Sequence, residues 1–191
     1  VGGTTNLCHN AIDRHVTARG AQNALVAIST ETNTERAYTY AELHAEVQRM
    51  AAVLQSLGVK QGDRVLIYMP MIAEAAFAML ACVRIGAIHS VVFGGFASSS
   101  LASRIEDAEP VVIVSADAGA RGGKGVPYKP LLDEAIDLSA HKPAAVLLVD
   151  RGLAPAAMRA GRDHDWAALR EQHMDAQVPC VWVESTHPSY T

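Results

Sequence analysis

The sequence predicts an α/β fold with a mostly parallel sheet flanked by helices. Short, continuously apolar runs alternate with segments whose apolar residues recur at helical spacing. Runs such as 65–69 are apolar throughout, which is typical of strands buried on both faces of a parallel sheet. Glycines such as Gly58 and Gly86 follow the helical segments, where they favour helix termination. Together these features predict a strand–helix–strand order around one core.

The first expected element is a helix at 6–19, which Asn6 can cap and Gly20 can end. Its apolar face would include Leu7. A short strand at 25–29 and a partner near 37–39 follow, and the polar residues between them predict a hairpin turn.

The strongest helical pattern lies at 40–57, where apolar residues recur from Leu43 to Leu54. A buried strand at 65–69 and a second strong helix at 73–85 come next. The remaining expected elements are buried strands at 87–93, 111–115 and 145–149, helices at 98–107, 131–138 and 165–173, a last strand at 180–183, a long glycine-rich loop at 116–129 and an irregular connection at 151–162.

Composition excludes several classes of function. Half of the 191 residues are hydrophobic, and the net charge of −4 argues against a nucleic-acid-binding surface. The longest apolar run, at 75–83, is too short to cross a bilayer, so we expect no membrane partner. Cys8, Cys82 and Cys180 lack zinc-ligand spacing and fit reduced, core-packed thiols in a soluble cytoplasmic protein.

A glycine pair directly follows the expected strand at 87–93. In Phe93-Gly94-Gly95-Phe96 the glycines allow a sharp turn and a close approach by a ligand. The alternative is a tight strand-to-helix turn with both phenylalanines packed inward. The residues alone leave both interpretations open.

A second glycine-rich loop follows the strand at 111–115. Arg121 and Lys124 lie three residues apart with Gly122 and Gly123 between them, which suits a phosphate group. The alternative is a mobile surface loop with solvated charges. Both glycine-rich loops follow strands of one parallel sheet, so we expect them at its carboxyl edge, where ligands bind.

The histidines do not predict a metal or catalytic site. His9 and His15 do not share a helical face, so we expect structural pairing by Asp13 and Arg14 instead. His89 lies in an apolar strand and is expected to be a hydrogen-bonded core residue.

Several long stretches resemble one enzyme family. The segment AMLACVRIGAIHSVVFGGF at 78–96 closely resembles the AMP-forming acyl-CoA synthetases of the acetyl/propionyl type. DAGARGGKGVPYKPLLDEAI at 117–136, GRDHDWAALR at 161–170 and WVESTHPSY at 182–190 are more similar to the propionyl branch of that family. The resemblance extends over nearly the whole chain.

The resemblance implies the N-terminal domain of the acyl-adenylate-forming superfamily and a two-step ligase reaction. ATP and a short-chain carboxylate would give an acyl-adenylate with help from Mg²⁺, and coenzyme A would then displace AMP. Lys124 stands where acetyl-CoA synthetases typically have arginine, so its contact would be a point charge and not a fork. The residues that match coenzyme A positions are Phe93, Gly94, Gly95, Arg121, Gly122, Gly123 and Lys124.

The family's phosphate-binding loop does not occur in this sequence. We therefore expect residues 1–191 to form a single N-terminal subdomain that packs on the rest of its parent chain. It would hold no catalytic residue and no metal, and its ATP and Mg²⁺ sites would lie elsewhere in that chain. The alternatives are an acetyl-CoA synthetase fragment, a non-catalytic module that binds a nucleotide-like anion, and a purely structural lobe with an exposed apolar patch.

Overall fold

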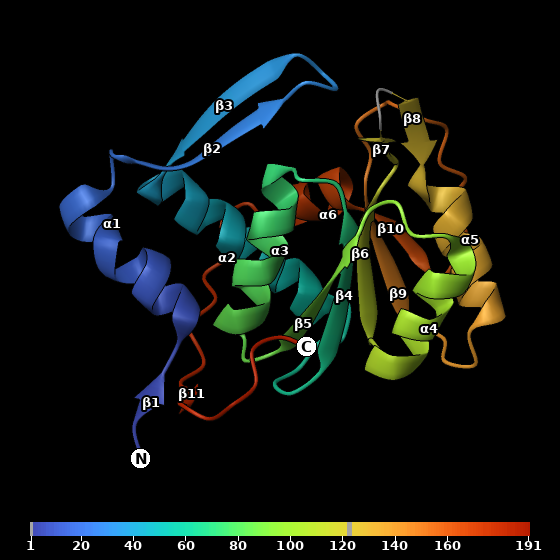
Figure 1. The fold of residues 1–191 in the computed structure, drawn as a ribbon. Coiled ribbons are helices and arrows are strands. Elements are labelled where there is room, and N and C mark those ends of the chain that lie inside the picture. Colours follow the sequence, from blue (N-terminus) through green and yellow to red (C-terminus); the bar gives the residue numbers. More distant parts are fainter. Residues whose placement is uncertain (1, 122–123) are drawn as a thin grey trace.

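A five-stranded parallel sheet forms the centre of the protein in the computed structural model, which describes residues 2–121 and 124–191, without the side chain of Arg121 (Figure 1). Across the sheet the strands are β10 (Asp163–Asp165), β9 (Ala145–Val149), β6 (Val112–Ala116), β4 (Arg64–Met69) and β5 (Ile88–Phe93). All four strand pairs are parallel. The predicted α/β fold class is confirmed.

Helices cover both faces of this sheet (Figure 1). One face carries α2 (Tyr40–Ser56), α3 (Ala73–Arg84) and α6 (Trp166–Gln172), and the other carries α4 (Ser98–Ala108) and α5 (Tyr128–Leu138). Between these layers every residue of β6 and β9 is buried, as their continuous apolar sequence predicts.

Helix α2 starts at a capping box. The Thr39 hydroxyl accepts a hydrogen bond from the Glu42 amide, and the Glu42 carboxylate accepts one from the Thr39 amide. Gly58 follows the helix with φ of +94°, a conformation in which a side chain would be strained. The predicted helix at 40–57 is therefore confirmed at both ends.

The first helical segment departs from the prediction. It consists of a π-helical turn, η1 (His9–Asp13), continued by α1 (Arg14–Arg19). The Asn6 side chain accepts a hydrogen bond from the His9 amide, 3.0 Å away, as expected of a cap. Leu7, expected on the buried face, is 51% exposed, because Cys8 and Ile12, four residues apart, form the buried face instead.

Two hairpins project from the body of the protein (Figure 1). The first, β2 (Asn23–Ser29) with β3 (Thr34–Thr39), confirms the predicted hairpin. The second, β7 (Ala118–Arg121) with β8 (Lys124–Pro127), occupies the segment predicted to be a long loop. That prediction was wrong for the described residues, since antiparallel backbone pairing joins 118–121 to 124–127 in spite of the glycines there.

Two strand predictions also need correction. Strand β5 is not buried throughout, because it lies at the edge of the sheet. Its last residue, Phe93, is exposed to solvent. The strand expected at 180–183 is replaced by β11 (Val183–Glu184), which pairs with β1 (Thr4–Thr5). Val181 instead donates its amide to the Arg84 carbonyl, 2.8 Å away, so side-chain and loop contacts hold this segment.

Among the described residues, no helix is long and apolar enough to span a bilayer.

Candidate functional site

The two glycine-rich segments emerge at the same edge of the sheet. Strand β4 lies between β5 and β6 and is parallel to both. Phe93, at the end of β5, is paired with Met69 at the end of β4, and Ala116 ends β6 on the other side. The expectation that both segments follow carboxyl ends of strands in one parallel sheet is confirmed. The two strands are not neighbours, because β4 separates them.

A cleft of about 500 Å³ opens at this edge. The end of β5 contributes Phe93 and Gly94, the β7–β8 hairpin contributes Ala120, and the tip of the β2–β3 hairpin contributes Thr30 and Glu31. Three segments that lie far apart in the sequence therefore share one concave surface. Concave surfaces at strand carboxyl ends are the usual ligand sites of parallel α/β sheets.

Tyr128 lies between the two glycine-rich segments. Its hydroxyl donates a 2.5 Å hydrogen bond to the Gly94 carbonyl. A Cβ atom added at Gly94 would lie 2.3 Å from the Tyr128 Oη, and one added at Gly119 would lie 2.2 Å from it. Both backbones can approach the phenol only because these residues are glycines. Burial, followed by the Glu31 carboxylate, raises the pKa of Tyr128 and so keeps its hydroxyl a proton donor.

A second buried tyrosine supports the same turn. The Tyr68 hydroxyl is 3.4 Å from the Phe96 carbonyl, and the Tyr68 and Tyr128 ring centroids are 4.9 Å apart. Burial raises the pKa of Tyr68 to about 12. The Phe93 and Phe96 rings are 65% and 37% exposed, so the alternative in which both pack inward is wrong.

Glu31 connects the β2–β3 hairpin to the edge of the cleft. Its carboxylate accepts a 2.5 Å hydrogen bond from the Ala120 amide and lies 2.6 Å from an Arg151 guanidinium nitrogen. Arg151 also donates to the Ala118 carbonyl. The Arg151 charge therefore offsets the negative charge that Glu31 brings to the cleft.

Asp117 holds the segment that follows β9. Its buried Oδ2 accepts hydrogen bonds from the amides of Leu153 and Ala154, at 2.6 and 3.3 Å. Its Oδ1 faces the Arg151 Nε at 3.6 Å, which exceeds hydrogen-bond distance. This carboxylate thus fixes the loop beside the cleft, a role that the sequence analysis did not assign to it.

The sequence-predicted site residues are brought together only in part. Phe93 and Gly94 line the cleft, and Gly95 is half-buried in the adjoining turn. Lys124 is exposed at the start of β8 and is not among the residues that line the cleft. Gly122, Gly123 and the side chain of Arg121 lie outside the described residues.

Sequence analysis missed Tyr128 and Glu31 as site residues. Tyr128 lies in the second glycine-rich stretch but was given no role there, and Glu31 lies in no motif. The contacts of both become visible only when the segments meet. The glycines at 94 and 119 were the available signal, since a buried glycine after a strand indicates the close approach of another group.

The histidine and acid predictions had mixed outcomes. Asp13 does pair structurally, because its Oδ2 lies 2.9 Å from an Arg84 nitrogen and its Oδ1 lies 3.2 Å from the His44 Nε2. His89 is not a fully hydrogen-bonded core histidine: its buried Nδ1 has no hydrogen-bond partner among the residues that the structure describes, and burial lowers its pKa.

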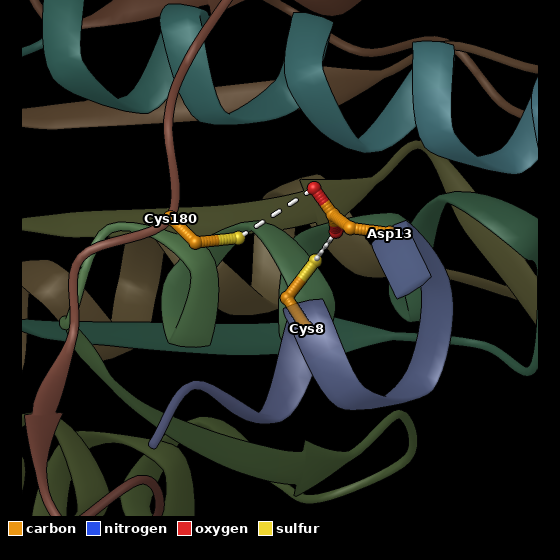
Figure 2. Close-up of side chains that lie close together, drawn as sticks. All are labelled: Cys8, Asp13 and Cys180. Atoms are coloured by element: carbon orange, nitrogen blue, oxygen red, sulfur yellow. Dashed lines mark hydrogen bonds between the residues drawn. The ribbon is translucent and has the colours of Figure 1, made fainter. Parts of the chain in front are cut away.

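In the described part of the chain, one group of side chains is close enough to share a metal ion: Cys8, Asp13 and Cys180 (Figure 2). None of the three lines the cleft.

Comparison with known proteins identifies the family. The model of the family described as AMP-binding enzyme matches residues 12–189, nearly the whole chain. The chain belongs to the AMP-binding enzyme family. The resemblance on which the sequence prediction rested is thereby confirmed.

Individual members of the family differ in how similar they are to this chain. The chain is 63% identical over 98% of its length to the propionate–CoA ligase of Escherichia coli, of which it covers 30%. It is 49% identical to the acetyl-coenzyme A synthetase of Methylobacterium radiotolerans, over 98% of the chain and 29% of the relative. The structure resembles that of acetoacetyl-CoA synthetase from Streptomyces lividans, with a TM-score of 0.85 and 30% identity over 98% of this chain and 28% of that one. The chain thus spans less than a third of the length of these relatives.

Proposed function

We propose that residues 1–191 form the N-terminal subdomain of a propionate–CoA ligase. The parent enzyme would activate a short-chain carboxylate with ATP to an acyl-adenylate and transfer the acyl group to coenzyme A. The higher identity to propionate–CoA ligase than to acetyl-coenzyme A synthetase, 63% against 49%, favours propionate over acetate. The observation that carries the proposal is the shared cleft at the carboxyl edge of β5 and β6.

The role proposed for this subdomain is to supply one wall of a coenzyme A site. The exposed Phe93 ring offers an apolar surface, and the glycine backbone at 94 lets a ligand lie close to the sheet edge. Lys124, on the neighbouring hairpin, is an exposed cation with no carboxylate within salt-bridge distance among the described residues. We propose that it and Arg121 meet the nucleotide phosphates, with Gly95, Gly122 and Gly123 allowing the approach.

The remaining chemistry is assigned to residues outside this chain. The sequence contains no phosphate-binding loop, so the ATP and Mg²⁺ sites and the C-terminal domain are proposed to lie elsewhere in the parent enzyme. When bound there, Mg²⁺ would neutralise phosphate charge during adenylation. The three unpaired cysteines support a reducing, cytoplasmic location for this enzyme.

Binding of coenzyme A tests the proposed wall directly. We expect the chain to bind coenzyme A weakly and dephospho-coenzyme A about tenfold more weakly, because one charge-assisted contact is lost. Lys124→Ala should reduce this difference when both ligands are titrated by calorimetry. Lys60→Ala is the matched control, since Lys60 is exposed in the turn before β4, at the opposite edge of the sheet. Equal affinities for the two ligands would refute the phosphate contact.

Pyrophosphate exchange tests the assignment of adenylation. With propionate, ATP and Mg²⁺, the 191-residue chain should give no exchange of label between pyrophosphate and ATP. The longer enzyme should give exchange that is faster with propionate than with acetate. Exchange by the 191 residues alone would contradict the location proposed for the ATP site, and a preference for acetate would favour an acetyl-CoA synthetase.

A further inference from the structure

A cluster of two thiols and a carboxylate lies on the α3 side of the protein, away from the cleft. Figure 2 shows Cys8 and Asp13 on the first helical segment and Cys180 on the strand-free segment near the end of the chain. Each thiol lies 3.7 Å from one oxygen of the Asp13 carboxylate. The two sulfurs and the carboxylate oxygen all lie within 4.8 Å of one another.

The contacts around the cluster fix its geometry. Arg84, which is 3% exposed, donates to the Cys8 sulfur at 3.4 Å, to Asp13 at 2.9 Å and to the Val178 carbonyl at 2.6 Å. The buried Asn6 side chain donates to the Val181 carbonyl at 2.8 Å. Backbone on both sides of Cys180 is therefore hydrogen-bonded to buried side chains, so the two thiols face each other in a built site.

Arg84 argues against a metal ion in this cluster. Its guanidinium is fixed between Cys8 and Asp13, where it already balances the carboxylate charge. A zinc ion would bring two further positive charges against it and would find only three ligands where tetrahedral zinc sites have four. The side chains fit a thiol pair better than a metal site.

The two thiols differ in accessibility and acidity. Cys8 is fully buried, and its pKa is raised by its contact with Cys180 and by burial. Cys180 is half-buried, and its pKa is lowered, first by its contact with Cys8 and further by the Arg84 charge, while burial and Asp13 oppose the effect. His44 faces the cluster through its contact with Asp13. Such asymmetry is typical of a reactive thiol beside a resolving one.

We propose that Cys8 and Cys180 form a reversible, hydroperoxide-sensing disulfide. The Cys180 thiolate attacks one oxygen of hydrogen peroxide, the O–O bond breaks, and Cys180 sulfenic acid and hydroxide form. The Cys8 thiol then attacks the sulfenic sulfur and the S–O bond breaks, and the departing hydroxide takes the Cys8 proton, so that the disulfide and water form. The hydroxide from the first step takes the proton that Cys180 released when it ionised. In sum, two thiols are oxidised and one peroxide is reduced to two waters.

The disulfide would join segments from the two ends of the chain. The sulfurs must move from a separation within 4.8 Å to a bond length of about 2.05 Å, which side-chain rotation and small backbone shifts can supply. The bond would hold the 178–181 segment on α3 independently of Arg84. We therefore expect the oxidised protein to unfold at a higher temperature than the reduced protein.

Peptide mapping after oxidation tests the proposal. The full chain is treated with stoichiometric hydrogen peroxide, alkylated and digested, and the cross-linked peptides are quantified by mass spectrometry. The Cys8–Cys180 cross-link should exceed any cross-link to Cys82 by roughly tenfold, because thiolate character and access select the reactive site. Dithiothreitol should remove it. The same treatment in denaturant should abolish the selectivity.

Three variants separate the roles of the thiols. Cys8→Ser should stop the reaction at Cys180 sulfenic acid, which dimedone captures, and Cys180→Ser should leave Cys8 unmodified. Cys82→Ala, at a fully buried cysteine outside the cluster, should leave the cross-link unchanged. Circular dichroism checks that each variant is folded. Oxidation of Cys180 no faster than Cys82, or one Zn²⁺ bound per chain and lost in Cys180→Ser, would overturn the proposal.

Discussion

At the scale of single residues, Gly94 shows how closely the cleft is built around one phenol. Gly94→Ala would place a methyl group 2.3 Å from the Tyr128 Oη and disrupt the hydrogen bond to the Gly94 carbonyl. We expect a loss of about 2 kcal/mol in the free energy of unfolding, measured with urea. Gly125→Ala is the control, because its added Cβ meets no atom within 4 Å. Equal stabilities of the two variants would show that the turn at Gly94 adjusts to accommodate the added methyl group.

Asp13 gives a prediction for pH dependence. Burial acts to raise its pKa, but hydrogen bonds from His44 and Arg84 outweigh burial and hold the pKa well below its usual range. A carboxyl whose pKa falls on folding stabilises the protein fully above its unfolded pKa of about 4, and the contribution declines as pH falls toward the folded pKa.

Asp13→Asn should therefore cost about 3 kcal/mol near neutral pH, because Arg84 stays buried without its partner. The difference in the free energy of unfolding between this variant and the unsubstituted chain should become smaller as the pH falls below about 4. Urea unfolding across this pH range measures it. Asp175→Asn, at an exposed carboxylate, should show little change at any pH. A difference that does not vary with pH would contradict the role assigned to the Asp13 charge.

At the scale of elements, Glu31 is expected to hold the β7–β8 hairpin in place. Glu31→Ala removes the acceptor for the Ala120 amide and the partner of Arg151. Amide hydrogens of residues 118–121 and 124–126 should then exchange at least several-fold faster, as measured by mass spectrometry, because less free energy opposes local opening. Glu35→Ala on the same hairpin is the control, since Glu35 is exposed. Unchanged exchange in Glu31→Ala would show that backbone pairing alone orders the hairpin.

The elements that sequence predicted well are those with a local cause. Thr39 and Gly58 mark the ends of α2, and the apolar run of β4 predicts burial whatever its neighbours are. The β7–β8 hairpin could not be predicted in this way, because its glycines favour a loop. It forms by antiparallel backbone pairing, and its Ala120 amide donates to Glu31, which is distant in the sequence. The segment around Cys180 has strand-like residues, but Arg84 and Asn6 occupy its backbone groups.

For the candidate site too, only the features with a local cause in the sequence could be predicted. Glycines after two strands of one parallel sheet predicted that Phe93 and Gly94 would lie at the same edge as the second glycine-rich segment, and the cleft that they share with Ala120 agrees with this. The position of Tyr128 between the two glycine-rich segments could not be inferred, because it depends on how distant parts of the chain pack together. The coenzyme A contacts of Lys124 stay a prediction.

At the scale of the whole molecule, exposed apolar side chains gather at the cleft. Met71 is 94% exposed, Ile28 is 67% exposed, and both line the cleft together with Val91 and Phe93. A concentration of this kind is typical of a surface that another part of a protein covers. It supports the proposal that this subdomain packs on the rest of a longer enzyme.

The 191-residue chain should accordingly self-associate at high concentration. The double variant Ile28→Thr with Met71→Ser should associate more weakly, because it removes exposed apolar surface. Sedimentation velocity should show that association then requires about a tenfold higher protein concentration. Leu138→Ser is the control, because Leu138 is 59% exposed on α5 and does not line the cleft. A monomer at all concentrations would argue against an uncovered packing surface.

The position of Tyr128 gives the protein an intrinsic probe of its own binding site. The phenol contacts both glycine backbones, so any molecule that displaces either one changes the electronic environment of the ring. Fluorotyrosine at this position would therefore report occupancy of the cleft through its ¹⁹F chemical shift, without a dye or a labelled ligand.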